Sequence, residues 1–446
     1  MPASPSPTPS VPNAFRPASA ADGPRGWTVG GLALGDLADR FGTPLWVLDA
    51  GEIRDRALRL RKACGSYWPG PAGVVFASKA HGHPAVAGLV AMAGAGIEAV
   101  SLGEIEAALA AGIAPAKLVL QGHGRSADDY RRALALGVRT VHIDALDEIP
   151  ALAAAARTAE ARVDVRVRVL PGITAATHPA LATGIRESKF GLPEGPVLDE
   201  AIRMVRAEPS LHLQGLQLHV GSQIHDLGTF EATAAVAGQV SASLLHRLGW
   251  SPEVLDLGGG LGVPYLPDDP APTPENWVRA LAQGLRRGWP DRTGPWPTLV
   301  LEPGRWLVAN AGCTVYRILS VKSANGCVIV DGGLSDNPRI ALYDANYVHE
   351  PVLPQGGHLR PWRLAGRTCE EGDELGTVNL EDPVPGQLVV GWCAGAYHYP
   401  MASRYNRLPR PPLVLVDNGR VAVASRRETE ADLSATESPR PDWFTA

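Results

Sequence analysis

Four groups of residues that could do chemistry stand where short apolar runs end in the sequence. They are Lys79, His219, the triple glycine Gly258 to Gly260, and Glu302. A lysine amine in an apolar pocket can form a Schiff base, because desolvation lowers its pKa. Glycine amides can approach a phosphate group without a Cβ in the way, and a carboxylate can keep a heterocyclic nitrogen protonated. The histidine ring could cover one face of an aromatic cofactor.

Each of these groups also has an ordinary structural explanation. A lysine often extends past a strand end to reach solvent, and a triple glycine often forms a tight turn. Glu302 could form a salt bridge with nearby Arg305, and a strand histidine is usually a core residue. Chance alone would rarely place a Schiff-base amine, a phosphate-binding loop and a pyridinium carboxylate at one face of a barrel. Together they indicate pyridoxal 5'-phosphate.

The elements that must position these residues form an alternating pattern between residues 74 and 302. Eight runs of β-branched and apolar residues alternate with helix-like segments, which predicts an α/β fold with a (β/α)8 barrel of the TIM type. The chemical residues stand where runs end, and barrel enzymes build their active sites at the C-terminal ends of the strands. The predicted strands are Val74–Ser78, Ile97–Val100, Leu118–Gln121, Thr140–Ile143, Val163–Val169, Leu213–His219, Val254–Leu257 and Thr298–Glu302.

Past Arg305 the pattern changes to short strand-like runs with turn residues. This pattern predicts a C-terminal all-β domain, either a β-barrel or a sandwich. Residues 27–49 contain Leu45-Trp46-Val47-Leu48, so we expect them to join the β domain from the other end of the chain. The expected organisation is a disordered Pro-rich tail at 1–26, this N-terminal segment at 27–49, the cofactor-binding barrel at 50–305, the β domain at 306–430 and a loose C-terminal tail at 431–446.

The composition argues against several classes of function. With a net charge of -5, the chain of 446 residues offers no basic field for nucleic acid or anionic lipid. Its five cysteines are scattered and form no CxxC motif, which argues against disulfides and against a metal site. We find no secretory signal and no run of roughly 20 apolar residues that could span a bilayer. A cytoplasmic protein that binds neither nucleic acid nor membrane is expected.

Motifs in the order of a known family cover nearly everything from Trp27 to Leu433. By these motifs the chain resembles the barrel-type, group IV pyridoxal-phosphate decarboxylases of fold type III. The resemblance implies a pyridoxal-phosphate-dependent amino-acid decarboxylase, a carboxy-lyase. The matching blocks are Phe-Ala-Ser-Lys79-Ala, Ser188-Lys-Phe-Gly, His219-Val-Gly-Ser-Gln-Ile, Asp256-Leu-Gly-Gly-Gly-Leu-Gly, Glu302-Pro-Gly-Arg, Asp331-Gly-Gly-Leu-Ser-Asp-Asn-Pro-Arg-Ile-Ala-Leu-Tyr343, Cys369-Glu-Glu-Gly-Asp373, Gly395-Ala-Tyr397 and Met401-Ala-Ser-Arg-Tyr-Asn406.

The resemblance implies roles for residues at the cofactor. Lys79 would carry pyridoxal phosphate as a Schiff base, His219 would stack on its ring, and Glu302 would pair with the ring nitrogen. The family also implies a head-to-tail homodimer in which Cys369 and Glu370 reach into the neighbour's active site. Cys369 is then a candidate proton donor, and with Lys79 and His219 it completes the expected catalytic set. The residues expected around the phosphate are Ser222, Gly259, Gly260, Gly304 and Tyr397.

Substrate choice is expected to depend on the distal end of the amino acid. Arg305, Arg339 and Tyr343 match the family's clamp for a distal carboxylate, which arginine binds bidentately. Tyr397 is also expected at the substrate, and Glu370 could pair with a distal ammonium group. A substrate that bears both charges, such as meso-2,6-diaminopimelate, explains both residue types. Its decarboxylation would give L-lysine and carbon dioxide, and would belong to lysine biosynthesis.

Departures from the family pattern leave more than one activity open. Glu98 stands where the family usually has an aspartate, and His81 where asparagine is frequent. These departures permit a paralogous decarboxylase that acts on a related dicarboxylic or basic amino acid in a specialised pathway. The sequence also permits a racemase on the same barrel and a non-catalytic pyridoxal-phosphate carrier.

Overall fold

The computed structural model describes residues 14–440, apart from 176, 179–180, 182 and 186–187. The chain forms two compact units. The barrel unit comprises Glu52–Ala309, and the β unit comprises Phe15–Gly51 together with residues from Asn310 onward. Each unit is built around a sheet of its own.

Eight parallel strands form the closed barrel of the barrel unit. Each strand pairs with the next along the chain, and β13 pairs back with β5, which closes the ring. The predicted (β/α)8 fold is therefore confirmed. The strands are β5 (Ala72–Ala77), β6 (Gly96–Ala99), β7 (Leu118–Leu120), β8 (Thr140–Ile143), β9 (Val163–Leu170), β11 (Leu211–Gln217), β12 (Val254–Asp256) and β13 (Thr298–Leu301), and the short β10 (Leu192–Pro193) pairs with β9.

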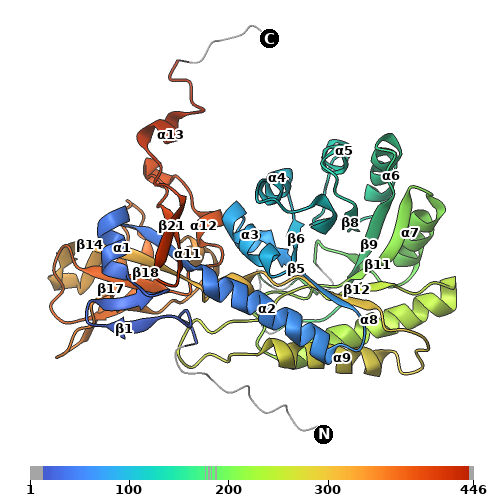
Figure 1. Ribbon diagram of the computed structural model, residues 1–446, viewed down its shortest axis with the longest axis horizontal. Helices are drawn as coiled ribbons and strands as arrows, with labels where there is room; N and C mark the ends of the chain where they lie inside the picture. Colours follow the sequence, from blue (N-terminus) through green and yellow to red (C-terminus); the bar gives the residue numbers. More distant parts are fainter. Residues whose placement is uncertain (1–13, 176, 179–180, 182, 186–187, 441–446) are drawn as a thin grey trace. The chain divides into compact units, whose positions relative to one another are not determined.

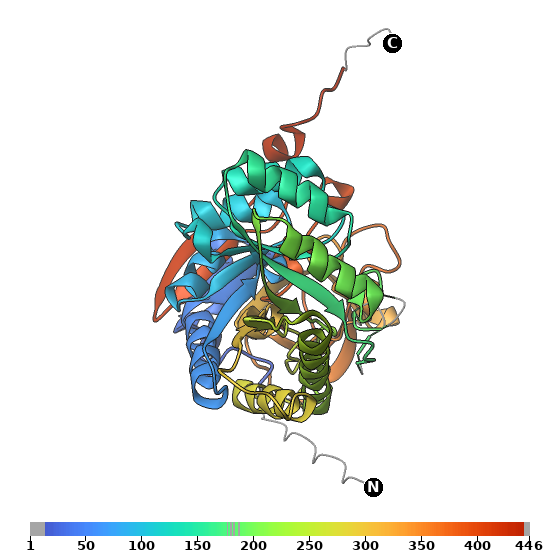
Figure 2. The same cartoon turned by 90° about the vertical axis from the view of Figure 1, so that its right-hand side faces the viewer.

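Helices surround the barrel strands, as Figure 2 shows. Their start points are set by local capping: Ser126 and Asp129 form a reciprocal capping box on α5, and Asp226 accepts hydrogen bonds from the first turn of α8. No described helix is both long and apolar enough to cross a membrane. The helices are α2 (Ala50–Tyr67), α3 (Pro84–Met92), α4 (Leu102–Ala110), α5 (Ala127–Ala135), α6 (Glu148–Thr158), α7 (Pro196–Ala207), α8 (Leu227–Leu248), α9 (Pro274–Gly288) and α10 (Arg305–Val308).

The β unit contains a second sheet, in which β14 is the central strand. β14 pairs with β15, β19 and β4, and the circuit β14-β15-β17-β18-β16-β19 returns to β14, so six strands close into a small barrel. The predicted all-β domain is confirmed. Its strands are β4 (Leu45–Asp49), β14 (Gly312–Lys322), β15 (Cys327–Val330), β16 (His349–Pro351), β17 (Arg360–Ala365), β18 (Glu374–Leu380), β19 (Leu388–Trp392), β20 (Leu413–Asp417) and β21 (Arg420–Ser425).

The N-terminal strand β4 lies inside the sheet of the β unit. It pairs antiparallel with β14 on one side and parallel with β20 on the other. All five of its residues are buried, because both faces of the strand are covered. In Figure 1 the blue N-terminal elements of this unit lie among the orange and red elements from the end of the chain.

The two ends of the chain differ from their expected bounds. We expected a tail up to residue 26, but Phe15 is only 2% exposed in a core cluster, and β1 (Ala21–Gly23) pairs with β2 (Gly26–Val29). At the other end Leu433 is buried in the short helix α13 (Glu430–Ser434). Residues 1–13 and 441–446 of the expected tails lie outside the described residues. The expected bounds differ because a single apolar residue, such as Phe15 or Leu433, packs into a core although the residues around it are polar or proline.

Candidate active site

The predicted residues of the barrel unit follow neighbouring strands at one end of the barrel. Lys79 lies in the 3-10 turn η1 (Ser78–Ala80) directly after β5, and Glu302 follows β13. His219 comes two residues after β11, and the triple glycine follows β12 closely. Since β11, β12, β13 and β5 are consecutive in the sheet, these residues share the C-terminal end of the barrel.

Glu302 is the deepest acid of the group that sequence analysis selected. It is 5% exposed, and its Oε2 accepts a hydrogen bond from Gln217 Nε2 at 3.0 Å. With its amide nitrogen turned toward the acids, Gln121 donates to Glu302 Oε1 at 3.2 Å and also to Glu98. Burial, reinforced by the charge of Asp256, raises the pKa of Glu302 to about 8. Glu302 can therefore hold a proton deep in the barrel.

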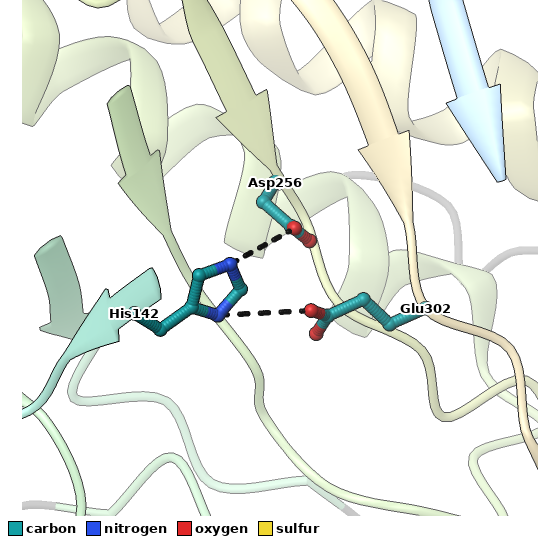
Figure 3. A group of neighbouring side chains, drawn as sticks. All are labelled: His142, Asp256 and Glu302. Carbon is teal, nitrogen blue, oxygen red and sulfur yellow. Dashed lines mark ion pairs between the residues drawn. The ribbon is translucent and has the colours of Figure 1, made fainter. Parts of the chain in front are cut away.

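His142 lies between Asp256 and Glu302, as Figure 3 shows. Its Nε2 is 3.7 Å from Asp256 Oδ2 and its Nδ1 is 3.8 Å from Glu302 Oε1. Burial and the charges of Arg166 and Arg168 hold the pKa of His142 well below its usual range, so the imidazole is neutral. Sequence analysis did not single out His142, because a histidine in a strand resembles an ordinary core residue.

These three residues are the one group among the described residues whose ligand atoms are close enough to share a metal ion. Sequence analysis predicted no metal site. Arg166 Nη1 already contacts Asp256 Oδ2 at 2.9 Å, so a positive charge is in place where a cation would bind. The direct contacts of the two acids come from other residues: Arg166 pairs with Asp256, and Gln217 donates to Glu302, while the neutral His142 ring packs between the acids without a hydrogen bond.

Lys79 offers an accessible amine beside this network. Its side chain is 47% exposed, and Nζ lies 4.0 Å from Oε1 of the buried Glu98. Burial and the charge of Glu302 raise the pKa of Glu98 to about 8, and Lys79 partly offsets this rise. The arrangement therefore places an accessible amine beside a pair of buried acids.

His219 presents a neutral ring next to the glycine loop. Its Nδ1 accepts a hydrogen bond from the Gly259 N–H at 3.3 Å, which assigns the ring proton to Nε2. Burial, followed by the charges of Lys79 and Arg168, lowers the pKa of His219 well below its usual range. A neutral, fixed imidazole suits contact with the face of an aromatic ring.

The glycine loop has room only for glycine. A Cβ on Gly259 would lie 2.1 Å from the Glu302 carbonyl oxygen, and a Cβ on Gly260 would lie 2.2 Å from that of Gly221. Gly260 also has a φ of +102°, which side chains rarely adopt. The amides of Gly258 and Gly259 are engaged by Asp256 and His219, so Gly260 is the amide of the three that best suits a phosphate group.

Ser222 and Arg305 meet beside this loop. Arg305 is buried, its Nη2 is 3.3 Å from Ser222 Oγ, and its Nη1 donates to Tyr265 OH at 2.5 Å. The positive charge, the hydroxyl and the Gly260 amide form a setting that favours anions. Gly304 precedes Arg305, and a Cβ there would lie 3.0 Å from that of Ala80. The Ser222 hydroxyl and the Gly260 amide fit the phosphate of pyridoxal phosphate, and the Arg305 guanidinium beside them provides a positive charge for a second anionic group, so the residues present agree with that cofactor.

Tyr265 is a site residue that sequence analysis missed. It follows Gly-Leu-Gly-Val-Pro in the loop after β12, where the sequence gives no periodic signal. Its position in a loop at the C-terminal end of a barrel strand was the available clue. Gln121 and Gln217 were not assigned roles for a different reason: a polar residue at a strand end gives no sign of which acid it contacts.

The β unit brings three predicted residues together. The buried Arg339 begins α11 (Arg339–Tyr343), and its guanidinium carbon lies 5.0 Å from the Tyr343 ring centre and 4.9 Å from that of Tyr397. Its Nε donates to Tyr347 OH at 2.9 Å. Tyr397 has a φ of +67° and precedes α12 (His398–Met401). An arginine held between aromatic rings keeps its remaining N–H groups in a fixed direction.

Cys369 and Glu370 form another predicted pair in the β unit, on the turn between β17 and β18. Cys369 Sγ lies 3.9 Å from Asn406 Oδ1, and Glu370 accepts a hydrogen bond from Tyr405 OH. Cys369 is exposed, whereas the other four cysteines are buried, and all five are free thiols. The pair is thus presented at the surface of its unit.

Comparison with known proteins identifies relatives along most of the chain. Residues 50–309 match the family model described as pyridoxal-dependent decarboxylase, pyridoxal binding domain. The chain is 41% identical to a diaminopimelate decarboxylase of Actinosynnema pretiosum subsp. auranticum over 91% of each protein. It is 34% identical to the Bacillus subtilis diaminopimelate decarboxylase over 92% of this chain and 95% of that protein.

Solved structures agree with this result. The diaminopimelate decarboxylase of M. jannaschii in complex with L-lysine superposes with a TM-score of 0.88 at 28% identity, covering 95% of this chain and 99% of that one. The Helicobacter pylori enzyme with L-lysine gives a TM-score of 0.84 at 28% identity, over 90% and 98% of the two chains. A Vibrio vulnificus lysine/ornithine decarboxylase, at 23% identity and a TM-score of 0.72 over 86% and 97%, shares the fold.

Proposed function

The chain belongs to the diaminopimelate decarboxylases, a family of pyridoxal-dependent decarboxylases, and on this premise we propose that it converts meso-2,6-diaminopimelate to L-lysine and carbon dioxide. Its cofactor is pyridoxal 5'-phosphate. The observation that carries the proposal is the arrangement at one end of the barrel: the accessible Lys79 amine, the phosphate setting of Gly260 and Ser222 with Arg305 beside it, and the buried acid Glu302.

Several barrel residues would hold the cofactor, each at a different part of it. When bound, the cofactor supplies an electron sink for the electron pair that decarboxylation releases. Lys79 would hold it covalently through its amine. Glu302 would keep a proton at the ring nitrogen, and its bonds to Gln217 and Gln121 fix the direction of its carboxyl group. His219 would cover one face of the ring. The phosphate would be bound by Ser222, Gly259, Gly260, Gly304 and Tyr397.

The remaining predicted residues would recognise the substrate. Arg305, Arg339 and Tyr343, with Tyr397, would bind the distal carboxylate of diaminopimelate. Glu370 would pair with the distal ammonium group, and Cys369 would deliver the proton that replaces the lost carboxylate. Ornithine and lysine have no distal carboxylate for these arginines to bind, and they would place an ammonium group beside the arginines.

We also propose a head-to-tail homodimer, in which Cys369 and Glu370 serve the partner's active site. The support is the family resemblance and the exposure of this pair on its own unit. A cytoplasmic location is proposed from the five free cysteines, because reduced thiols are typical of that compartment.

A substrate panel tests the proposed function. The purified holoenzyme is incubated separately with meso-diaminopimelate, ornithine, lysine and arginine, and carbon dioxide release and amino-acid products are measured. We expect release from diaminopimelate with L-lysine as the product. Preference for ornithine or lysine would assign the chain to the basic amino-acid decarboxylases, loss of chirality without carbon dioxide would indicate a racemase, and no reaction with any substrate would favour a carrier.

Arg339→Ala is expected to raise KM for diaminopimelate by about 10- to 100-fold, the effect of losing a hydrogen bond to a charged group. Cofactor affinity should change far less, because Arg339 is assigned to the substrate. Steady-state kinetics and cofactor titration of the apoprotein give the two numbers. Arg363→Ala is the control, since this arginine is 53% exposed in the same unit. Equal losses in KM and cofactor affinity would contradict the assignment.

Tyr265→Phe is expected to raise KM by about threefold to tenfold with little change in kcat. The tyrosine hydroxyl holds one edge of the Arg305 guanidinium at 2.5 Å, so its loss lets the guanidinium turn away from the distal carboxylate. Tyr67→Phe is a matched control, because Tyr67 also lies beside an arginine, Arg279, but through its ring. An unchanged KM would exclude Tyr265 from substrate binding.

A further inference from the structure

Asp373 is a buried carboxylate that receives hydrogen bonds from two separate segments of the β unit. It is 3% exposed, and its Oδ1 accepts from the Leu334 N–H at 2.6 Å. Its Oδ2 accepts from the Thr368 N–H at 2.9 Å and from the Thr368 hydroxyl at 2.6 Å. The carboxylate therefore joins the segment after β15 to the turn between β17 and β18.

The segment after β15 leads directly into the helix that begins with Arg339. A Cβ on Gly333 would lie 2.2 Å from Asp373 Oδ1, so glycine is needed there for the carboxylate to approach. The same segment is held on its other side by Asp336, whose Oδ1 accepts from the Gly333 N–H and whose Oδ2 accepts from Tyr316 OH, both at 2.8 Å. Hydrogen bonds therefore fix this segment on both sides, and Asp373 attaches the turn between β17 and β18 to it.

The turn between β17 and β18 carries Cys369 and Glu370. The Gly366 N–H donates to the Asp373 carbonyl at 2.8 Å, and the Asp373 N–H donates to the Glu370 carbonyl at 3.1 Å, which closes the turn on itself. A Cβ on Gly366 would lie 2.2 Å from Asp373 Oδ1. The backbone and side chain of Asp373 both fix this turn, whereas the Cys369 side chain is exposed.

We propose that Asp373 is a positioning residue for Cys369 and Glu370: its carboxylate fastens their turn to the segment that carries Arg339. One buried group would then set the direction of the proton donor, the ammonium-binding acid and the start of the carboxylate clamp. The inference rests on the proposed function for the roles of these three side chains. The fastening itself rests on the hydrogen bonds.

Asp373→Asn tests the proposal, because asparagine keeps the shape of the side chain. One of its two polar atoms becomes an NH2 group. In either orientation of the amide this group faces a backbone N–H donor, from which it cannot accept a hydrogen bond. We expect the turn to loosen, kcat for diaminopimelate to fall by about tenfold, and cofactor absorbance to stay unchanged. Glu371→Gln is the control, since Glu371 is an exposed carboxylate on the same turn.

A readout independent of turnover is the reaction of Cys369 with a thiol reagent in the holoenzyme without substrate. The other four cysteines are buried within their own chain, so the phase that Cys369→Ser removes is assigned to Cys369. The Asp373→Asn protein should react about tenfold faster than the parent. Thr368→Val removes one of the three hydrogen bonds to the Asp373 carboxylate and changes no charge. It should also speed the reaction of Cys369, by a smaller factor. If Asp373→Asn does not fold, the Thr368→Val result decides the question.

Unchanged thiol reactivity in the folded variant would overturn the proposal. So would faster thiol reaction with an unchanged kcat, because the fastening would then have no part in the reaction. The thiol measurement does not depend on which substrate is correct, so its failure is distinguishable from a failure of the substrate panel.

Discussion

Lys79→Ala protein is expected to lose covalent cofactor and to turn over diaminopimelate on the order of 10⁴-fold more slowly than the parent, the upper range for loss of a positioned proton-transfer group. The Lys79 amine is the accessible nitrogen beside the buried acids Glu98 and Glu302, and alanine leaves no nucleophile in its place. Visible absorbance and borohydride trapping followed by mass analysis measure the cofactor link. Carbon dioxide release measures turnover.

Lys117→Ala is the matched control for this change. Lys117 is exposed at the start of β7, at the opposite end of the barrel from the site, and should leave both measurements unchanged. Retained turnover in the Lys79→Ala protein would contradict the proposed mechanism directly.

The same variant gives a test of the proposed dimer. If Cys369 serves the partner's site, mixing Lys79→Ala with Cys369→Ala subunits should restore up to about a quarter of parental activity, because random pairing yields one intact site in half of the dimers. Each variant alone should stay inactive. Absence of recovery after verified subunit exchange would argue against shared sites.

Glu302→Gln is expected to lower kcat by about 10²- to 10³-fold, as when one preorganised electrostatic contact to developing charge is removed. Glutamine is neutral at every pH, so it cannot hold the ring proton as a carboxylate does. Glu253→Gln is the control, since Glu253 is 64% exposed near the start of β12. A kcat within twofold of the parent would exclude Glu302 as the partner of the ring nitrogen.

Glu302 also makes the stability of the apoprotein depend on pH. Folding raises the pKa of this carboxyl from its ordinary value of 4.5 to about 8. A group with a raised folded pKa contributes stability that is fully present below pH 4.5 and is lost as the pH rises through about 8. The Tm of the apoprotein should therefore fall between these values, and the Glu302→Gln protein should show a shallower fall. Glu98, with a pKa of about 8, Asp336 at about 7 and Asp256 at about 6 contribute to the slope that remains.

The barrel was predictable from sequence because its strands carry their signal locally. Runs such as Val163–Val169 are bounded by turn residues and separated by helix-like segments, and the order of strands in a (β/α)8 barrel follows the order of the chain. In the β unit the strands β16, β17 and β18 gave no such signal. β17 carries charged and proline residues, as Arg-Pro-Trp-Arg-Leu-Ala shows, and β16 pairs with β18 and β19 instead of with β17, which follows it in the chain.

The selected site residues could be predicted by their position after strands, but their supporting contacts could not. Lys79 and Glu302 have chemically distinctive side chains at strand ends. His142, Gln217 and Tyr265 act through distances of a few ångströms to other side chains, and no spacing along the chain encodes those distances. Asp373 illustrates the same limit, since Leu334, whose N–H it accepts, lies 39 residues away in the chain.

The interior position of β4 has a consequence for synthesis on the ribosome. β4 ends at Asp49, while its antiparallel partner β14 begins at Gly312, so the whole barrel is translated between them. At cellular elongation rates the strand waits on the order of tens of seconds for that partner. During this interval an apolar strand with both edges open is liable to pair with other nascent chains. The barrel can complete its ring first, and the second unit closes only when β19 and β20 have emerged.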